Sequence, residues 1–129
     1  MNGNFLLDTN IVIAIFAQEK TVLQRLAEAD QVFVSSIVLG ELYYGAQKSG
    51  RRAENITRVD EFAASNAVLD CTTRTANIYG EVKNRLRAKG RPLPENDIWI
   101  ASLAIQYGLT LVTRDSHFTD VDNLSVETW

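Results

Sequence analysis

A short apolar run that ends on an acid is the feature of this sequence that most constrains its fold. Phe5–Leu7 has the length and flanks of a buried strand, and it stops at Asp8. After Thr9 and Asn10, a second apolar stretch at residues 11–15 has the length of one or two helical turns. In an open α/β sheet, ligands bind at the carboxyl ends of the strands. A carboxylate buried there needs a cation close by, because an unpaired buried charge is costly.

The rest of the chain alternates strand-like runs with segments of helical periodicity. Short apolar runs predict strands at residues 5–7, 32–34 and 109–112, with weaker candidates at 67–69 and 124–126. Apolar residues at helical spacing predict helices at residues 20–29, 36–48, 53–65, 73–89 and 97–107. Gly108 predicts the end of the last of these helices. This alternation predicts an α/β fold with a short, mainly parallel sheet that helices cover on both faces.

Length and composition predict a single globular domain over residues 1–129. No apolar run is long enough to span a bilayer. Cys71 is the only cysteine, so no intrachain disulfide can form, and we expect a buried small side chain in a cytoplasmic protein. The charge is uneven: residues 51–91 carry nine bases and five acids, whereas residues 92–129 carry one base and six acids. A basic surface beside an acidic site is therefore expected.

Three further acids occupy positions comparable to that of Asp8. Asp97 opens the predicted helix 97–107, where an acid also serves as a helix cap. Asp115 follows the strand 109–112, where it is also an ordinary turn residue. Glu41 stands among apolar and small residues inside the helix 36–48, which predicts partial burial. Because the carboxyl ends of parallel strands share one edge, we expect all four acids to meet there.

Four carboxylates at one edge would repel one another, and some would stay protonated unless a cation joined them. No histidine or cysteine cluster accompanies these acids, and we expect the only histidine, His117, to be a neutral loop residue. Hard oxygen ligands favour Mg²⁺ or Mn²⁺ over Zn²⁺. The acids therefore predict a site for one of these two cations, with water as the nucleophile of any hydrolysis.

A set of ordered motifs resembles PIN-domain proteins of the VapC toxin type. The motifs are Phe5–Asn10, Ser36–Leu42 with Gly45, Asn96–Ala101, Leu111–Asp115 with His117 and Phe118, and Val126–Trp129. The resemblance implies a three-layer α/β/α sandwich and a Mg²⁺- or Mn²⁺-dependent endoribonuclease that cuts RNA such as tRNA. It also implies that the protein is the toxin of a type II toxin–antitoxin pair. Such a toxin would form a homodimer, and a VapB-type antitoxin would hold it inactive in a hetero-oligomer.

The same resemblance implies roles for individual residues. Asp8, Glu41, Asp97 and Asp115 would be the catalytic, metal-binding acids. Thr113 and Asn10 would orient water or carboxylates, although Thr9 and Asn10 also suit the cap of the first helix.

Five bases precede the loop that leads to Asp97 and contain no acid among them: Lys83, Arg85, Arg87, Lys89 and Arg91. With Thr113, we predict that this basic strip binds the substrate through its phosphates. The alternative is a solvated helix end with cations at its C-terminus. For the antitoxin, the apolar segment 11–16 and the pair Tyr43-Tyr44 predict a groove for a partner helix. Ordinary core is the alternative, so exposure of Phe16 and Tyr44 discriminates between the two.

Two other functions remain open at this level. A phosphatase or phosphotransferase would use Asp8 as its nucleophile, but such enzymes need a second acid two residues on, where this chain has Asn10. A non-catalytic module would hold a metal through the same acids without cutting RNA.

Overall fold

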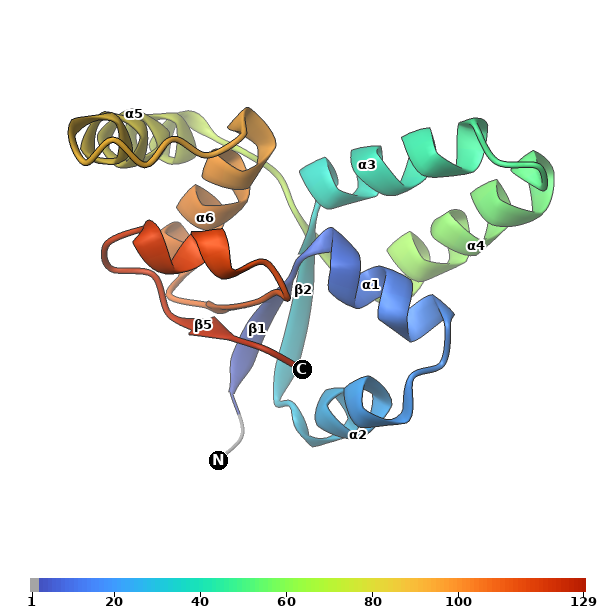
Figure 1. The fold of residues 1–129 in the computed structure, drawn as a ribbon. Helices are drawn as coiled ribbons and strands as arrows, with labels where there is room; N and C mark the ends of the chain where they lie inside the picture. Colours follow the sequence, from blue (N-terminus) through green and yellow to red (C-terminus); the bar gives the residue numbers. More distant parts are fainter. Residues whose placement is uncertain (1–2) are drawn as a thin grey trace.

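The computed structural model describes residues 3–129, which build one parallel sheet (Figure 1). The strands run in the spatial order β3-β2-β1-β4-β5, and each of the four pairings is parallel. The strands are β1 (Asn4–Leu7), β2 (Gln31–Ser35), β3 (Ala67–Leu69), β4 (Thr110–Val112) and β5 (Val126–Glu127). The α/β class with a short parallel sheet, predicted from the alternation of elements, is confirmed.

Helices cover both faces of this sheet (Figure 1). The helices are α1 (Thr9–Phe16), α2 (Lys20–Glu28), α3 (Ser36–Gln47), α4 (Arg52–Ser65), α5 (Thr73–Ala88), α6 (Glu95–Tyr107) and the 3₁₀ helix η1 (Ser116–Asp120). Helices α1 to α4 lie on one side of the sheet, and α5, α6 and η1 on the other. Right-handed crossovers require this division, because the chain moves towards one edge through β2 and β3 and towards the other through β4 and β5.

The strand order reverses between β1 and β4, which makes their carboxyl ends the switch point of the sheet. Leu7 pairs with Val112 in the parallel register. The backbone N–H of Asp8 continues this ladder by donating to the carbonyl of Val112 at 3.0 Å. Residues that follow β1 and β4 therefore emerge side by side.

The core packs against the two central strands. Leu6, Leu7, Leu111 and Val112 are fully buried, and each buried leucine contributes about 2 kcal/mol of hydrophobic stabilisation. Helix α6 is apolar around most of its circumference, because it lies between the sheet and α5. Gly108 ends this helix in the left-handed conformation at φ 63°, which confirms the predicted stop.

The predicted elements differ from the observed ones mainly at their ends. Helix α1 begins at Thr9, because the Asp8 side chain accepts the Thr9 N–H and caps it. Strand β5 begins at Val126, two residues later than the predicted run 124–126. Strand β3, a weak candidate, is confirmed as an edge strand.

The prediction for Cys71 was wrong. Its side chain is exposed, because it lies in the loop that follows the exposed edge strand β3. None of the helices in the described part of the chain is long and apolar enough to cross a membrane.

Candidate functional site

Asp8 is the buried centre of a polar cluster at the switch point of the sheet. Only 6% of the residue is exposed, and its Oδ1 accepts the backbone N–H of Thr9 at 2.8 Å. Burial raises the pKa of Asp8, while hydrogen bonds from Thr113 and Thr9 oppose the shift. The charges of Glu41 and Asp115 raise this pKa further. Asp8 is thus held rigidly, with other carboxylates near it.

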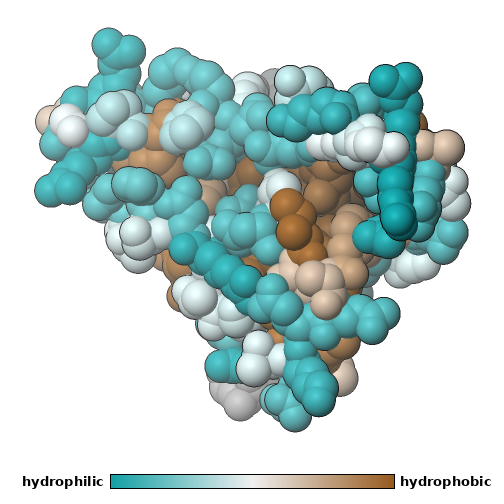
Figure 2. Space-filling model, turned by 45° about the vertical axis from the view of Figure 1, so that its right-hand side comes forward, coloured by the Kyte–Doolittle hydropathy of each residue, from teal (hydrophilic) through white to brown (hydrophobic). Residues whose placement is uncertain are grey.

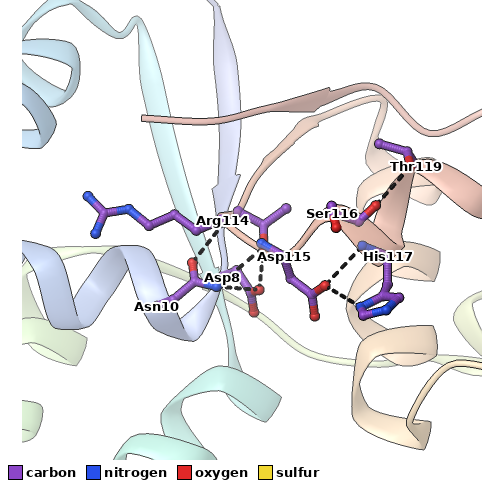
Figure 3. A network of polar contacts seen from close by, with 8 residues as sticks. Asp8, Asn10, Arg114, Asp115, Ser116, His117 and Thr119 are labelled. Carbon is purple, nitrogen blue, oxygen red and sulfur yellow. Dashed lines mark hydrogen bonds and ion pairs between the residues drawn. The ribbon is translucent and has the colours of Figure 1, made fainter.

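Thr113 and Asn10 connect Asp8 to the end of β4. Figure 3 shows Asn10 and Asp8 beside Arg114 and Asp115. The Thr113 hydroxyl donates to Asp8 Oδ2 at 2.7 Å and accepts the Asp115 N–H at 3.0 Å. The Asn10 amide lies 3.5 Å from Asp8 Oδ2, and its oxygen accepts the Arg114 N–H at 3.2 Å. Asn10 therefore does not cap α1; it joins the segments that follow β1 and β4.

Asp115 caps the 3₁₀ helix η1 and faces the only histidine (Figure 3). Its Oδ1 accepts the His117 N–H at 2.9 Å and lies 2.8 Å from the His117 ring Nδ1. The backbone N–H of His117 holds the pKa of Asp115 below its usual value, and the imidazole adds to this effect. The sequence did not predict this contact: the expected neutral loop residue lies in η1, and its ring contacts a candidate acid.

Glu41 reaches the same region from α3 and is half-buried, as its apolar neighbours predicted. The Thr9 hydroxyl donates to Glu41 Oε1 at 2.7 Å. This contact ties the first turn of α1 to the second turn of α3. Thr9 thus positions an acid rather than capping a helix.

Asp97 shows most clearly that the four acids converge. It is the third residue of α6 and makes no cap hydrogen bond there, so capping does not explain its position. Burial and then the charges of Asp8, Asp115 and Glu41 raise the pKa of Asp97 from 3.8 to about 6. Because each of the other three acids acts on it, all four share one electrostatic site at the carboxyl edge of the sheet.

The donor set fits a hard cation. Carboxylates with hydroxyl and amide groups between them are the oxygen-rich surroundings that Mg²⁺ and Mn²⁺ accept. Within residues 3–129, no three carboxylate, imidazole or thiol side chains are arranged to hold a metal ion as they stand. Asp8, Glu41 and Asp115 instead use oxygens to accept hydrogen bonds from Thr113, Thr9 and His117.

The predicted basic strip is partly neutralised by acids on neighbouring elements. Lys83 Nζ lies 2.6 Å from Glu95 Oε1, and Lys89 Nζ lies 2.6 Å from Asp122 Oδ1. Arg85, Arg87 and Arg91 are exposed, and none of them appears among the ion pairs within residues 3–129. The unpaired positive charge of the basic strip is therefore carried by its three arginines.

An apolar groove lies between α1, α3 and α4, and Figure 2 shows hydrophobic surface in this hollow with polar side chains around it. Its volume is about 390 Å³, and its walls include Ile13, Phe16, Leu42 and Val59. Ile13 is 54% exposed and Phe16 is half-buried, whereas Ile11 and Val12 are core. Part of the apolar segment 11–16 thus faces solvent, as predicted for a groove. Neither Tyr43 nor Tyr44 lines it, so the prediction that this pair forms the same groove was wrong.

Two contacts of the site could not be predicted from the sequence. The pairing of Thr9 with Glu41 joins residues 32 positions apart, and the pairing of His117 with Asp115 depends on the 3₁₀ turn of η1. The spacing of His117 two residues after Asp115 was the only signal of the second contact.

Comparisons with known proteins agree with this architecture. Residues 5–124 match the PIN domain family. The chain is 37% identical to ribonuclease VapC2 of Rickettsia felis and 33% identical to the tRNA(fMet)-specific endonuclease VapC of Shigella flexneri, each over 97% of both chains. A crystal structure of VapBC2 from Rickettsia felis bound to a promoter DNA fragment contains a chain with a TM-score of 0.89 and 35% identity, covering 98% of each chain. The protein therefore belongs to the PIN-domain family and, within it, to the VapC ribonucleases.

Proposed function

We propose that this protein is the toxin of a type II toxin–antitoxin pair and acts as a Mg²⁺- or Mn²⁺-dependent endoribonuclease. The observation that carries the proposal is the half-buried position of Asp97 beside three other acids at the switch point, where burial and their charges raise its pKa. An arrangement that costs electrostatic energy is typical of a functional site. Membership of the VapC ribonucleases agrees with RNA hydrolysis.

Asp8, Glu41, Asp97 and Asp115 are the metal-binding acids in this proposal. When bound, the cation supplies a charge that stabilises the phosphodiester transition state and lowers the pKa of water. Asp8 has the best-defined position of the four acids, because its backbone N–H donates to the Val112 carbonyl and its side chain accepts the Thr113 hydroxyl. Water is the nucleophile, since the only histidine of the sequence contacts Asp115 rather than a serine or cysteine.

Thr9, Asn10 and Thr113 are positioning residues. Thr113 and Thr9 each donate to one acid at 2.7 Å, so each fixes a carboxylate orientation. Asn10 holds the two segments that carry Asp8 and Asp115 together. Such outer groups hold ligands in place and are costly to remove.

The substrate is RNA, and we propose tRNA as its class because the relative from Shigella flexneri is named a tRNA(fMet)-specific endonuclease. The exposed arginines Arg85, Arg87 and Arg91 contribute long-range attraction for phosphates. Lys83 and Lys89 contribute less, because each is already paired with an acid. This substrate also favours a cytoplasmic location.

The partner is a VapB-type antitoxin, in line with the VapBC complexes among the structural neighbours. The groove of α1, α3 and α4 suits an apolar helix face or an extended segment of that partner. Thr9 and Glu41 belong both to this groove and to the acidic site. A segment bound there would reach the catalytic acids. The expected assembly is a homodimer that forms a hetero-oligomer with the antitoxin.

Sequencing of RNA ends after brief expression in bacterial cells tests the proposed function. The parent protein should create new ends at a few positions in tRNA, and Asp8→Asn at equal abundance should not. Asp70→Asn, an exposed acid after β3, is the matched control and should cut like the parent. Identical RNA ends in cells that express the parent and Asp8→Asn would contradict the proposal.

A further inference from the structure

Helix α3 has a second exposed side, which shares only Glu41 and Gly45 with the apolar groove. Its buried side is formed by Val38, Leu39, Leu42 and Ala46. The other side follows the helical spacing and lines a separate groove of about 610 Å³, together with one residue of α6: Ile37, Gly40, Glu41, Tyr44, Gly45, Lys48 and Asn96. Because Glu41 lines this groove and Asn96 precedes Asp97, the groove borders the acidic site.

We propose that this second groove binds the nucleotide of the RNA strand next to the scissile phosphate, with Tyr44 as the base-stacking residue and Lys48 as the phosphate contact. The inference rests on the proposed ribonuclease function and names the substrate contacts of the same site. It concerns α3, whereas the basic strip lies on α5.

Tyr44 is the residue that points to a nucleic acid. It is 67% exposed, although tyrosine is a large aromatic side chain. It lies three positions after Glu41 and therefore on the same side of the helix. Exposed aromatic rings beside a backbone-binding site are the usual platform for an unpaired base.

Lys48 supplies the charge that a phosphate needs in this groove. Its Nζ lies 4.8 Å from the centroid of the Tyr44 ring. None of the ion pairs within residues 3–129 includes Lys48, in contrast to Lys83 and Lys89. Glu41 and Lys48 are seven residues apart, which is about 10 Å along the helix axis. A phosphate at Lys48 is thus separated from the one at the acids.

The glycines leave room for a ligand along the same wall. A Cβ atom at Gly40 or Gly45 would contact nothing within 4 Å. Glycine inside a helix costs about 1 kcal/mol relative to alanine, so packing within the chain does not explain either residue. The wall of the groove beside Glu41 and Tyr44 is therefore open at both positions.

The two grooves beside α3 differ in the partner that they suit. The first is lined by Ile13, Phe16 and Val59 and fits an apolar peptide. The second presents an aromatic ring, an ammonium group and the Asn96 amide, which fit the base, phosphate and base edge of a nucleotide. Its chemistry therefore favours RNA over the antitoxin.

Binding of 3′-labelled bulk bacterial tRNA to the cleavage-deficient Asp8→Asn protein tests this subsite. Tyr44→Leu should raise the Kd about tenfold, since stacking is lost, and Tyr44→Phe should restore most of the affinity. Lys48→Gln should reduce the slope of log Kd against log salt by about 0.7, as expected for one phosphate contact. Lys20→Gln, a matched change of an exposed lysine on α2, should leave both quantities unchanged.

Unchanged tRNA affinity and salt slope in Tyr44→Leu and Lys48→Gln would overturn the subsite. The subsite would also be overturned if Tyr44→Leu lowered the affinity for the purified VapB-type antitoxin but left the affinity for tRNA unchanged. Cleavage of the same tRNA by the protein with Asp8 intact separates the two proposals: if it cuts and the groove variants bind normally, only the subsite fails. If it neither binds nor cuts tRNA, the ribonuclease function fails as well.

Discussion

At the scale of single residues, the acids of the switch point work against the stability of the metal-free fold. Asp97 has a pKa of about 6, above its usual 3.8, because burial and three neighbouring acids disfavour its charge. The unfolded chain loses this proton at lower pH than the folded chain. The penalty therefore appears as the pH rises from about 4 to about 6, and it is fully present at neutral pH.

The first prediction concerns this penalty. Asp97→Asn should raise the free energy of unfolding of the metal-free protein by about 1 kcal/mol near pH 7.5, after allowance for solvent screening at a half-buried carboxylate. At about pH 3 the gain should largely disappear, because the parent carboxyl is then mostly protonated in both the folded and the unfolded state. Thermal unfolding in EDTA at the two pH values measures this difference. A gain of equal size at both pH values would point to packing rather than charge.

At the scale of elements, α5 carries the basic strip on a surface that its neighbours partly neutralise. Glu95 of α6 and Asp122 of the loop after η1 hold Lys83 and Lys89. The sequence could not show this, because both pairs join residues more than ten positions apart. Arg85 and Arg87 retain the unpaired charge on the helix.

The second prediction concerns these arginines. The double reversal Arg85→Glu and Arg87→Glu should weaken tRNA binding severalfold and lower the salt slope by about 1.4, as for two phosphate contacts. Filter binding over a range of salt concentrations measures both quantities. Arg74→Glu, an exposed reversal three turns earlier on the same helix, is the control. An unchanged salt slope in the double variant would show that α5 carries only a solvated helix end.

The elements also show what the sequence could and could not predict. Strand ends and helix starts could be predicted from apolar runs and periodicity, so the placement of Asp8, Asp97 and Asp115 at one edge followed from parallel topology. Contacts that depend on side-chain reach across elements, such as Thr9 with Glu41, could not. Cys71 was mispredicted because local hydrophobicity does not reveal that β3 is an exposed edge strand.

At the scale of the whole molecule, α3 separates two grooves that share Glu41 and Gly45. We propose that the apolar one takes the antitoxin and the polar one takes RNA. Because both grooves include the candidate acid Glu41, an antitoxin bound in the apolar groove would contact the catalytic site. It would leave the polar groove, proposed for RNA, partly uncovered.

The third prediction separates these surfaces. Ile13→Gln should weaken antitoxin binding at least about tenfold, since a central apolar anchor is lost, and should leave tRNA cleavage unchanged. Leu23→Gln on α2, where the native leucine is 37% exposed, is the matched control. Calorimetric titration with purified antitoxin and a cleavage assay measure the two effects. Equal affinity of Ile13→Gln and Leu23→Gln for the antitoxin would place the contact elsewhere.

Cleavage of bulk bacterial tRNA by the purified protein tests the central claim most directly. The parent should cut with Mg²⁺ or Mn²⁺ and stop when EDTA removes the metal. Asp8→Asn and Asp97→Asn should each lower the rate at least about 100-fold, while Asp70→Asn should cut like the parent. Cleavage that persists in EDTA, or at the parental rate in both variants at equal purity, would contradict the assignment of these acids to a catalytic metal site.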